Sequence, residues 1–461
     1  MAKTKLVATN PATEEVVYEK PLDSQEDIEA KLELSEKTYY DFWKKTSFEE
    51  RAGYLRKVAK VMRDNLDDYA MPMVEEMGKP IKEARGEVQK AAWCAEHYAD
   101  HAEEYLKKEY IESDATKSYV QYLPLGPVLG VLPWNAPFWL AARFYAPALM
   151  AGNTCLMKHD SHVPKCAEYI TKAFVDAGVP EGVFQNLVIT SASIEWVIRH
   201  DAVRAVSVTG SDFAGSKIAS IAGSEIKPSV MELGGSDPSV VLSDANLEEA
   251  ADTICLMRLI NAGQSCIAAK RIIVEEPVYD KMIDLMKERF EKYKVGDPKD
   301  ESTDVGPIAR KDLRDDLHRQ VQASVKEGAR LVLGGEIPEG KGFYYPVTML
   351  ADVKPEMTAS CEETFGPIAA VMKAKDADEA LKLANATQYG LAASIWTDAS
   401  RGAEMASEIE SGQVAVNGIV KTDPRLPSGG VKRSGFGREL GPHGIKMFVN
   451  TQQVWIGPKK S

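Results

Sequence analysis

The stretch Asn261-Ala262-Gly263-Gln264-Ser265-Cys266-Ile267 places one cysteine in a glycine-containing turn after an apolar helix. A second stretch, Met231-Glu232-Leu233-Gly234-Gly235, places a carboxylate in a Gly-Gly turn upstream. A thiolate can attack a carbonyl carbon, and a neighbouring carboxylate can activate the water that later releases the acyl group. Taken singly, each residue is more often a buried structural cysteine or an exposed glutamate. Covalent catalysis is therefore predicted only with the support of further motifs.

Five further motifs accompany this pair in a fixed order along the chain. They are Pro133-Trp134-Asn135, Leu156-Met157-Lys158, Val208-Thr209-Gly210-Ser211, Glu362-Glu363-Thr364-Phe365-Gly366-Pro367 and Gly429-Gly430-Val431-Lys432-Arg433-Ser434-Gly435. Over about residues 10–455, the seven motifs resemble the landmarks of the NAD(P)-dependent aldehyde dehydrogenase superfamily. The residues around Cys266 are most similar to its succinate-semialdehyde dehydrogenase branch. The resemblance implies an enzyme that oxidises an aldehyde to a carboxylic acid and reduces NAD(P).

Length and composition are those of a globular protein with a large core. The chain has 461 residues, 44% hydrophobic and 27% charged, which is enough for two or three domains. Its 69 acidic residues outnumber its 56 basic ones, so a nucleic acid is not an expected partner. Six cysteines without CxxC spacing predict reduced thiols. Without a signal peptide or an apolar run of membrane length, we expect a cytoplasmic protein that binds no membrane.

The pattern of apolar residues changes along the chain. Apolar residues at spacings of three and four predict helices over 26–39, 49–62 and 69–105. From about residue 119 onward, short apolar strands alternate with helices. This alternation predicts parallel sheets with crossover helices, which is an α/β fold.

The resemblance divides this α/β fold into two parallel-sheet domains and a small extension. Residues 1–109 and 126–233 would form a Rossmann-type cofactor-binding domain, and residues 234–440 the catalytic domain. Residues 110–125 and 441–461 would form a β extension that adds strands to a neighbouring subunit. Because unpaired strand edges need a partner, we expect a homodimer or a homotetramer.

The predicted phosphate site lacks the usual G-x-G-x-x-G fingerprint. Instead, a predicted strand over 202–208 leads through Gly210 and Ser211 into a helix. Such a junction directs free N–H groups at an anion, and Ser211 adds a hydroxyl donor. A serine at this place is otherwise only a helix N-cap. The resemblance assigns the cofactor's pyrophosphate to this turn.

The resemblance also implies the other cofactor contacts. Lys158 would bind the adenosine ribose and belongs with Cys266, Glu232 and Asn135 to the groups of the mechanism. Glu363 would bind the nicotinamide ribose and Phe365 would pack on the nicotinamide ring. Trp134 and Leu233 complete the expected cofactor site. We expect no metal, because His97 and His101, four residues apart, have no evident third ligand.

The choice between NADP and NAD depends on a single position. NAD-preferring relatives often carry a glutamate three residues after the lysine, where this chain has Ser161. Lys158 with a small hydroxyl residue leaves room for the 2′-phosphate of NADP. Asp160 argues in the other direction. We therefore expect NADP, with NAD as the alternative.

The residues and the resemblance together predict the chemistry. Cys266 attacks the aldehyde, and the Asn135 amide with the Cys266 N–H stabilises the oxyanion. Glu232 then activates the water that hydrolyses the thioester, which favours a free acid over a coenzyme A ester. Two other classes stay open: a Cys–Glu esterase with a vestigial nucleotide pocket, and a non-catalytic protein of the same fold. Reduction of the cofactor, followed at 340 nm, would exclude the esterase.

The substrate prediction starts from Trp139 and Arg143, which share one face of a predicted helix after Asn135. Several succinate-semialdehyde dehydrogenases carry arginine at this place, and its guanidinium can bind a distal carboxylate. Succinate semialdehyde is therefore the expected substrate. The alternative is a structural arginine paired with an acid from another element.

Two departures from the pattern keep other aldehydes open. A second substrate arginine of some relatives is Ile260 here, and Arg258 or Arg425 would have to replace it. Ser428 stands where the family usually has phenylalanine, so it would border a wider or more polar tunnel. Lactaldehyde, glycolaldehyde and benzaldehyde are therefore alternative substrate types.

Overall fold

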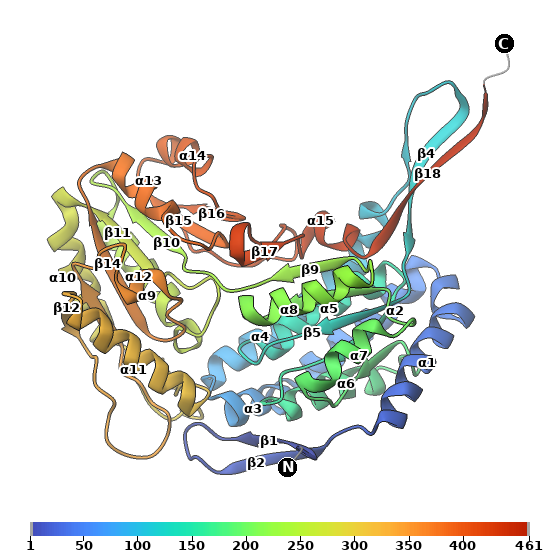
Figure 1. Cartoon of the computed structure of the whole chain (residues 1–461), viewed down its shortest axis with the longest axis horizontal. Coiled ribbons are helices and arrows are strands. Elements are labelled where there is room, and N and C mark those ends of the chain that lie inside the picture. Colours follow the sequence, from blue (N-terminus) through green and yellow to red (C-terminus); the bar gives the residue numbers. More distant parts are fainter. Residues whose placement is uncertain (1–2, 459–461) are drawn as a thin grey trace.

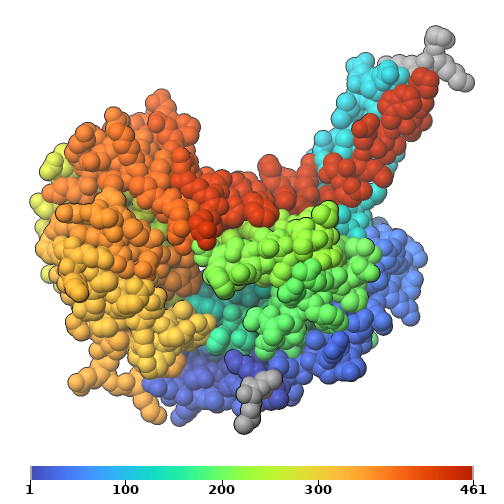
Figure 2. All heavy atoms as spheres, in the orientation of Figure 1, coloured from blue at the N-terminus to red at the C-terminus, as the bar shows by residue number. Residues whose placement is uncertain are grey.

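The computed structural model describes residues 3–458 and contains two α/β lobes with an extended arm (Figure 1). Each lobe is built around one mainly parallel sheet, and the arm is a small antiparallel sheet. The space-filling view shows a hollow where the yellow and orange lobe meets the green one (Figure 2). The predicted α/β fold class is confirmed. The domain boundaries stay predictions.

The first lobe contains a six-stranded sheet. In spatial order its strands are β17 (Gly435–Phe436), β9 (Ser229–Glu232), β8 (Ala205–Thr209), β5 (Pro127–Val131), β6 (Thr154–Lys158) and β7 (Phe184–Asn186). All neighbours are parallel except β17, an edge strand from far along the chain. Its helices are α1 (Gln25–Asp41), α2 (Phe48–Asp64), α3 (Leu66–Met77), α4 (Ile81–Tyr105), α5 (Pro137–Met150), α6 (Pro164–Asp176), α7 (Ile194–Arg199) and α8 (Asp212–Ser224).

The helical run predicted over 69–105 is two helices in the structure, α3 and α4. Gly78 ends α3 with a left-handed φ of 76°. Pro80 precedes α4 and has no backbone N–H to continue a helix. The apolar spacing continues through this break, which is why periodicity alone does not reveal it.

The second lobe contains a seven-stranded sheet. Its spatial order is β12 (Arg330–Leu333), β13 (Thr348–Ala351), β14 (Ile368–Ala374), β11 (Arg271–Glu275), β10 (Pro238–Val241), β15 (Ala392–Trp396) and β16 (Gln413–Val416). Only β12 is antiparallel to its neighbour. Its helices are α9 (Leu247–Leu259), α10 (Tyr279–Phe290), α11 (Lys311–Lys326), α12 (Thr358–Cys361), α13 (Ala377–Asn385) and α14 (Ala399–Ala406).

Strands near both ends of the chain form two antiparallel units. Strand β18 (Val449–Pro458), which follows α15 (Gly441–Lys446), pairs with β4 (Ala115–Pro124), and β3 (Glu109–Tyr110) lies on the other side of β4. The sequence leaves β18 without an evident partner because β4 is so distant along the chain. The hairpin of β1 (Lys5–Thr9) and β2 (Val16–Pro21) was not predicted. No helix within residues 3–458 is long and apolar enough to cross a membrane.

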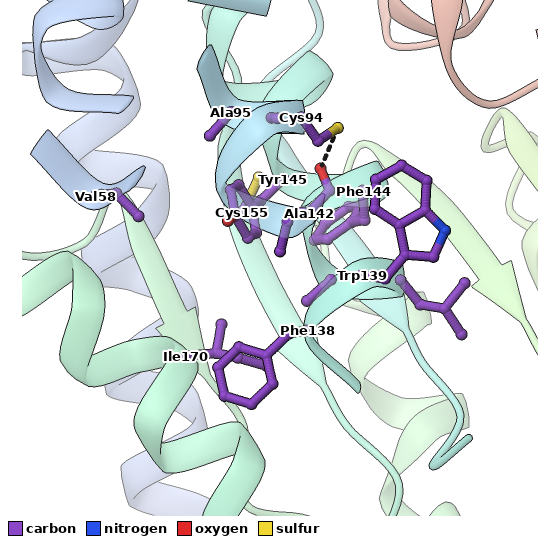
Figure 3. Packing of buried hydrophobic residues seen from close by; sticks show 14 of the residues in the cluster. Val58, Cys94, Ala95, Phe138, Trp139, Ala142, Phe144, Tyr145, Cys155 and Ile170 are labelled. Carbon is purple, nitrogen blue, oxygen red and sulfur yellow. Dashed lines mark hydrogen bonds between the residues drawn. The ribbon is translucent and has the colours of Figure 1, made fainter. Parts of the chain in front are cut away.

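Helix α5 lies in the core and is buried along its whole length. Figure 3 shows Phe138 and Tyr145 among its buried side chains, together with Cys94 of α4, whose Sγ donates to the Ala142 carbonyl at 3.7 Å. Close packing leaves such a helix little freedom to move. It is therefore a rigid support for Trp139, which it carries, and for the segment that precedes it.

Candidate active site

Cys266 and Glu232 lie in contact in the structure. Cys266 Sγ is 3.6 Å from Glu232 Oε1, and Glu232, at the end of β9, is 1% exposed. Burial raises the pKa of the Glu232 carboxyl to about 7. Burial, followed by the nearby Glu232 charge, raises the pKa of the Cys266 thiol well above its usual value. The structure thus brings together the nucleophile and the base that the sequence predicts.

The turn that carries Cys266 has an unusual backbone. Asn261 and Ala262 adopt left-handed φ values of 57° and 53°, and Gly263 follows at 73°. A Cβ atom on Gly263 would lie 2.3 Å from the Gly366 carbonyl oxygen. Left-handed non-glycine residues persist only where their surroundings hold them. The turn is therefore fixed by close contact with the loop that contains Gly366.

Two buried cations hold this turn from behind. Arg258 donates through Nη2 to the Gly263 carbonyl at 2.7 Å, and also to the backbone of the loop that carries Glu363. Lys270 Nζ donates to the Cys266 carbonyl at 2.6 Å and pairs with Glu363 Oε1 at 3.1 Å. Neither role has a signal in the sequence. The Arg258 guanidinium is thus bound to backbone carbonyls that hold the turn in place. It is not free to take the place of the substrate arginine that some relatives have at the position of Ile260.

Asn135 belongs to the same network. Its Nδ2 donates to the Gln264 carbonyl at 3.2 Å, directly beside the cysteine turn. Its own carbonyl accepts hydrogen bonds from Lys79 Nζ at 3.0 Å and from Asn261 Nδ2 at 2.8 Å. The backbone of Asn135 is therefore fixed, and its side-chain amide is held by one long hydrogen bond.

Arg143 lies in a buried cluster with two carboxylates. Its Nη2 is 2.5 Å from Glu439 Oε2 and 3.7 Å from Glu232 Oε1, and it donates to Ser428 Oγ at 3.3 Å. The guanidinium thus has acid partners from other elements, as in the structural alternative that the sequence left open. Glu439 was missed, because nothing in its surrounding sequence distinguishes it from a surface glutamate.

Two cavities meet at Asn135 and Cys266, which border both. The larger cavity has a volume of about 500 Å³, and Trp139, Arg143 and Ile260 are among its lining residues. The smaller cavity has a volume of about 220 Å³. Six predicted cofactor residues line it: Trp134, Gly210, Ser211, Leu233, Glu363 and Phe365. Two molecules entering from these two sides would therefore meet at the cysteine.

Three predicted residues lie away from this meeting point. Lys158 ends β6, is 9% exposed, and has no carboxylate oxygen within 4.0 Å among the described residues. Ser161 lies close to the N-terminal strand β1. Ser428 is buried against Arg143, and Arg425, the other possible substitute arginine, pairs with Asp423 at 2.6 Å.

Comparison with known proteins identifies the family. The model of the aldehyde dehydrogenase family matches residues 1–454. The chain belongs to the aldehyde dehydrogenase family. It is 44% identical over 460 residues to the succinate-semialdehyde dehydrogenase [NADP(+)] of Mycobacterium avium (strain 104), covering 99% of this chain and 98% of that protein.

Two further relatives of this aldehyde dehydrogenase also have names that specify a succinate-semialdehyde dehydrogenase. The succinate semialdehyde dehydrogenase [NAD(P)+] of Escherichia coli (strain K12) is 44% identical over 453 residues, with 98% of each chain covered. The solved succinic semialdehyde dehydrogenase of Streptococcus pyogenes, in complex with NADP+, has a TM-score of 0.96 and 33% identity. That alignment covers 98% of this chain and all of that chain. The predicted class, an NAD(P)-dependent aldehyde dehydrogenase, is confirmed.

The smaller cavity of this aldehyde dehydrogenase fits the nicotinamide end of such a cofactor. Trp134 and Phe365 form an apolar wall, with ring centroids 5.7 Å apart in an edge-to-face arrangement. Ser211 caps the N-terminus of α8, where N–H groups and the helix dipole favour a phosphate. Gly215 lets α8 approach closely, because a Cβ there would lie 2.4 Å from Leu233 Cδ2. The donors and apolar surfaces that a dinucleotide needs are thus present.

Replacement of Glu439 should change the pH profile of this aldehyde dehydrogenase. The Glu439 charge raises the pKa of Glu232, whereas Arg143 lowers it. In Glu439→Gln, the negative charge that raises the pKa of Glu232 is removed. Glu232 is then the remaining carboxylate of this cluster beside Arg143, so the pKa of Glu232 falls. The lower limb of a plot of kcat against pH should move to lower pH by roughly one unit. An unmoved limb, or one moved upward, would show that this cluster does not set the pKa of Glu232.

Proposed function

We propose that this aldehyde dehydrogenase oxidises succinate semialdehyde to succinate and prefers NADP to NAD. The observation that carries the chemistry is the meeting of two cavities at Cys266, beside a buried Glu232. The names of relatives at 44% identity over nearly the full length support this substrate. One of those names specifies NADP and the other specifies both nucleotides.

In the proposed first half-reaction, Cys266 Sγ attacks the carbonyl carbon of an aldehyde bound in the larger cavity, which Cys266 lines. Its proton has an acceptor at hand in Glu232 Oε1, 3.6 Å away. The Asn135 amide exchanges its hydrogen bond to the Gln264 carbonyl for the new oxyanion, to which the Cys266 N–H also donates. A bound nicotinamide ring supplies the acceptor for the hydride that leaves the substrate carbon. The chain is then left with a thioester on Cys266.

In the second half-reaction, Glu232 is the base. Glu232 first releases to solvent the proton it took from Cys266. As a carboxylate it then takes a proton from water, the resulting hydroxide attacks the thioester carbon, and the acid leaves as the proton on Glu232 passes to the Cys266 sulfur. A pKa of about 7 suits this role, because the carboxylate is both available and basic near neutral pH. Arg143 and Glu439 act through Glu232 by setting its charge state.

The preference for NADP rests on the region around Lys158. Its ammonium has no acid partner among residues 3–458 within 4.0 Å, and burial lowers its pKa. Asp160 is hydrogen-bonded to His162, with Oδ1 2.7 Å from Nδ1. A 2′-phosphate at Lys158 would therefore meet a cation that has no carboxylate oxygen within 4.0 Å among the described residues, and in place of a glutamate the small Ser161 stands three residues later.

The arm supports a proposed homo-oligomer. Edge strand β18 is mostly exposed, including Trp455 at 45% and Ile456 at 47%. An exposed edge strand with large apolar side chains is stable in solution when another strand or surface covers it. We therefore expect two copies of the chain to associate through β4 and β18, as a dimer or within a tetramer.

Initial rates of nicotinamide reduction test the substrate and the cofactor together. Succinate semialdehyde is compared with butanal, which has the same carbon chain without the carboxylate, each with NADP and with NAD. We expect kcat/KM for the semialdehyde to exceed that for butanal by roughly 10–100-fold, the value of one charge-assisted contact. NADP should give the higher kcat/KM. Equal rates with butanal would overturn the substrate and leave the dehydrogenase chemistry intact.

A further inference from the structure

Lys270 is a fully buried cation beside the nucleophile, and the proposed mechanism does not use it. It follows Cys266 by four residues and is 0% exposed. Its Nζ donates to the Ser265 carbonyl at 2.9 Å and to the Cys266 carbonyl at 2.6 Å, and it forms an ion pair with Glu363 Oε1 at 3.1 Å. The three protons of the ammonium therefore each have an acceptor. Because burying a charge is costly unless it is paired and hydrogen-bonded, this site is built around the ammonium.

Glu363, the acid partner of Lys270, is held against the turn that follows the catalytic base. Its Oε1 also accepts a hydrogen bond from the Gly235 N–H at 3.1 Å. A Cβ atom on Gly234 would lie 2.5 Å from Glu363 Oε2, so the absence of a side chain there permits this approach. Glu363 lines the smaller cavity with Phe365, whose ring centroid is 5.9 Å from Lys270 Nζ. The carboxylate on the cofactor side is therefore fixed by two donors, one of which is the ammonium.

The turn of the base and the turn of the nucleophile are in close contact at this point. A Cβ atom on Gly235 would lie 2.9 Å from the Cys266 carbonyl oxygen, which is the oxygen that Lys270 binds. Arg258, the other buried cation of this turn, donates to backbone carbonyls. Lys270 differs from it because one of its bonds goes to a carboxylate at the smaller cavity. Its ammonium thus contacts both the turn of the nucleophile and a predicted cofactor ligand.

Charged groups from several elements act on the Cys266 thiol. Burial raises the pKa of the thiol most, and the charges of Glu232 and Glu363 raise it further. Lys270, and to a smaller extent Arg143, lower it. The Lys270 charge therefore favours the thiolate, and the charge of its partner Glu363 opposes this effect.

We propose that Lys270 is a positioning residue that couples the cofactor site to the nucleophile, because its ammonium holds the Glu363 carboxylate and the Cys266 turn in one fixed arrangement. The Lys270 charge also stabilises the thiolate that attacks the aldehyde carbon. The sequence predicts Glu363 as the ligand of the nicotinamide ribose, so a displaced carboxylate weakens cofactor binding. This inference rests on the proposed role of Cys266 as the nucleophile and is independent of which aldehyde the thiolate attacks.

Alkylation of Cys266 by iodoacetamide, which reaches it through the larger cavity, tests the effect of the charge. Lys270→Met removes the ammonium, so the pKa of the thiol rises and less thiolate is present at a given pH. We expect the alkylation rate at about pH 8, followed by mass spectrometry of the peptide that contains Cys266, to fall by roughly three- to tenfold. Glu363→Gln removes the opposing charge and should raise this rate by roughly threefold. A distorted turn would not change the rate in opposite directions, so two changes of the same sign would overturn the charge effect.

The dissociation constant of NADP, measured by calorimetric titration, tests the coupling of positions. Lys270→Met frees Glu363 from one of its two donors, so Kd should rise by roughly three- to tenfold, as for one lost hydrogen bond. Added to Glu363→Gln, the same change should raise Kd by less than about twofold, because the carboxylate that Lys270 positions is gone. Losses that multiply would overturn the coupling. If Lys270→Met alone does not fold, the double variant, which removes both charges of the pair, is compared with Glu363→Gln. Slower alkylation with an unchanged Kd then supports the proposal, and an unchanged alkylation rate overturns it.

Lys82→Met is the matched control. Lys82 borders the larger cavity, as Cys266 does, but its side chain is 41% exposed and pairs with Asp304 at 2.6 Å. Its alkylation rate and its Kd for NADP should both change by less than about twofold, since exposed charges contribute little. Neither measurement uses an aldehyde, so both stand if the proposed substrate is wrong. An unchanged alkylation rate and an unchanged Kd in Lys270→Met would overturn this inference and leave the proposed function intact.

Discussion

Cys266→Ala should abolish aldehyde oxidation, with kcat at least about 10⁴-fold below that of the unaltered enzyme. Alanine removes the only sulfur among residues 3–458 that lies against Glu232 and borders both cavities. No covalent intermediate can then form, and the remaining donors cannot supply a nucleophile. Initial rates with succinate semialdehyde and NADP measure the loss. Persistent turnover would show that the nucleophile is a different residue.

Two controls show that the loss is chemical and not structural. The Cys266→Ala variant should unfold at nearly the unaltered temperature and still bind NADP, because Cys266 belongs to none of the three hydrophobic core clusters of the described residues. Cys361→Ala is the matched variant, since Cys361 is an exposed free cysteine. It should retain full activity. A large loss in Cys361→Ala would indicate that cysteine replacement harms the enzyme for another reason.

Glu232→Gln should separate the two half-reactions. Glutamine keeps the size of the side chain but accepts no proton. Loss of the Glu232 charge lowers the pKa of the Cys266 thiol, so the thiol can lose its proton to solvent and form the thioester, which is then not hydrolysed. We expect a burst of about one equivalent of reduced nicotinamide per site, followed by steady-state turnover lowered by roughly 10²–10⁴-fold. Rapid mixing with detection at 340 nm records both phases. Turnover near the unaltered rate would mean that water is activated elsewhere.

The pH profile gives an independent test of Glu232. The pKa of its carboxyl is about 7, and the basic form is the active one. Turnover limited by hydrolysis therefore rises as the pH rises through about 7, and falls below it as the carboxylate is protonated. Glu232→Gln should lose this limb. Glu439→Gln is the matched variant from the same buried cluster. It keeps the Glu232 base, so its turnover should not slow after the first equivalent of reduced nicotinamide.

Much of the fold and of the catalytic pair is predictable because the relevant residues leave local signals. Cys266 stands in a glycine-containing turn, and alternating strands and helices indicate parallel sheets. The helix break at Gly78 and Pro80 is also marked by its residue types, although the apolar spacing conceals it. Strand β18 is recognisable as a strand, but its partner lies more than three hundred residues away. Pairing at that separation is decided by the tertiary structure.

The charged residues around the site are less predictable, because a charge shows its role only through its partners. The sequence predicts that Arg143 binds a substrate carboxylate, but in the structure its guanidinium forms ion pairs with Glu439 and Glu232. Lys90 is one of two lysines in the sequence of α4, but in the structure it lines the larger cavity and has no carboxylate oxygen within 4.0 Å among residues 3–458. Burial and pairing arise when distant elements come together, and no local pattern encodes them.

The most direct test of the proposed mechanism is mass spectrometry of Glu232→Gln after mixing with succinate semialdehyde and NADP. We predict that one succinyl group replaces the thiol hydrogen on the peptide that contains Cys266, in the amount of the burst. The same experiment with Cys266→Ala should give no adduct. A burst without any acyl group on Cys266, or an acyl group on another residue, would contradict covalent catalysis by this cysteine.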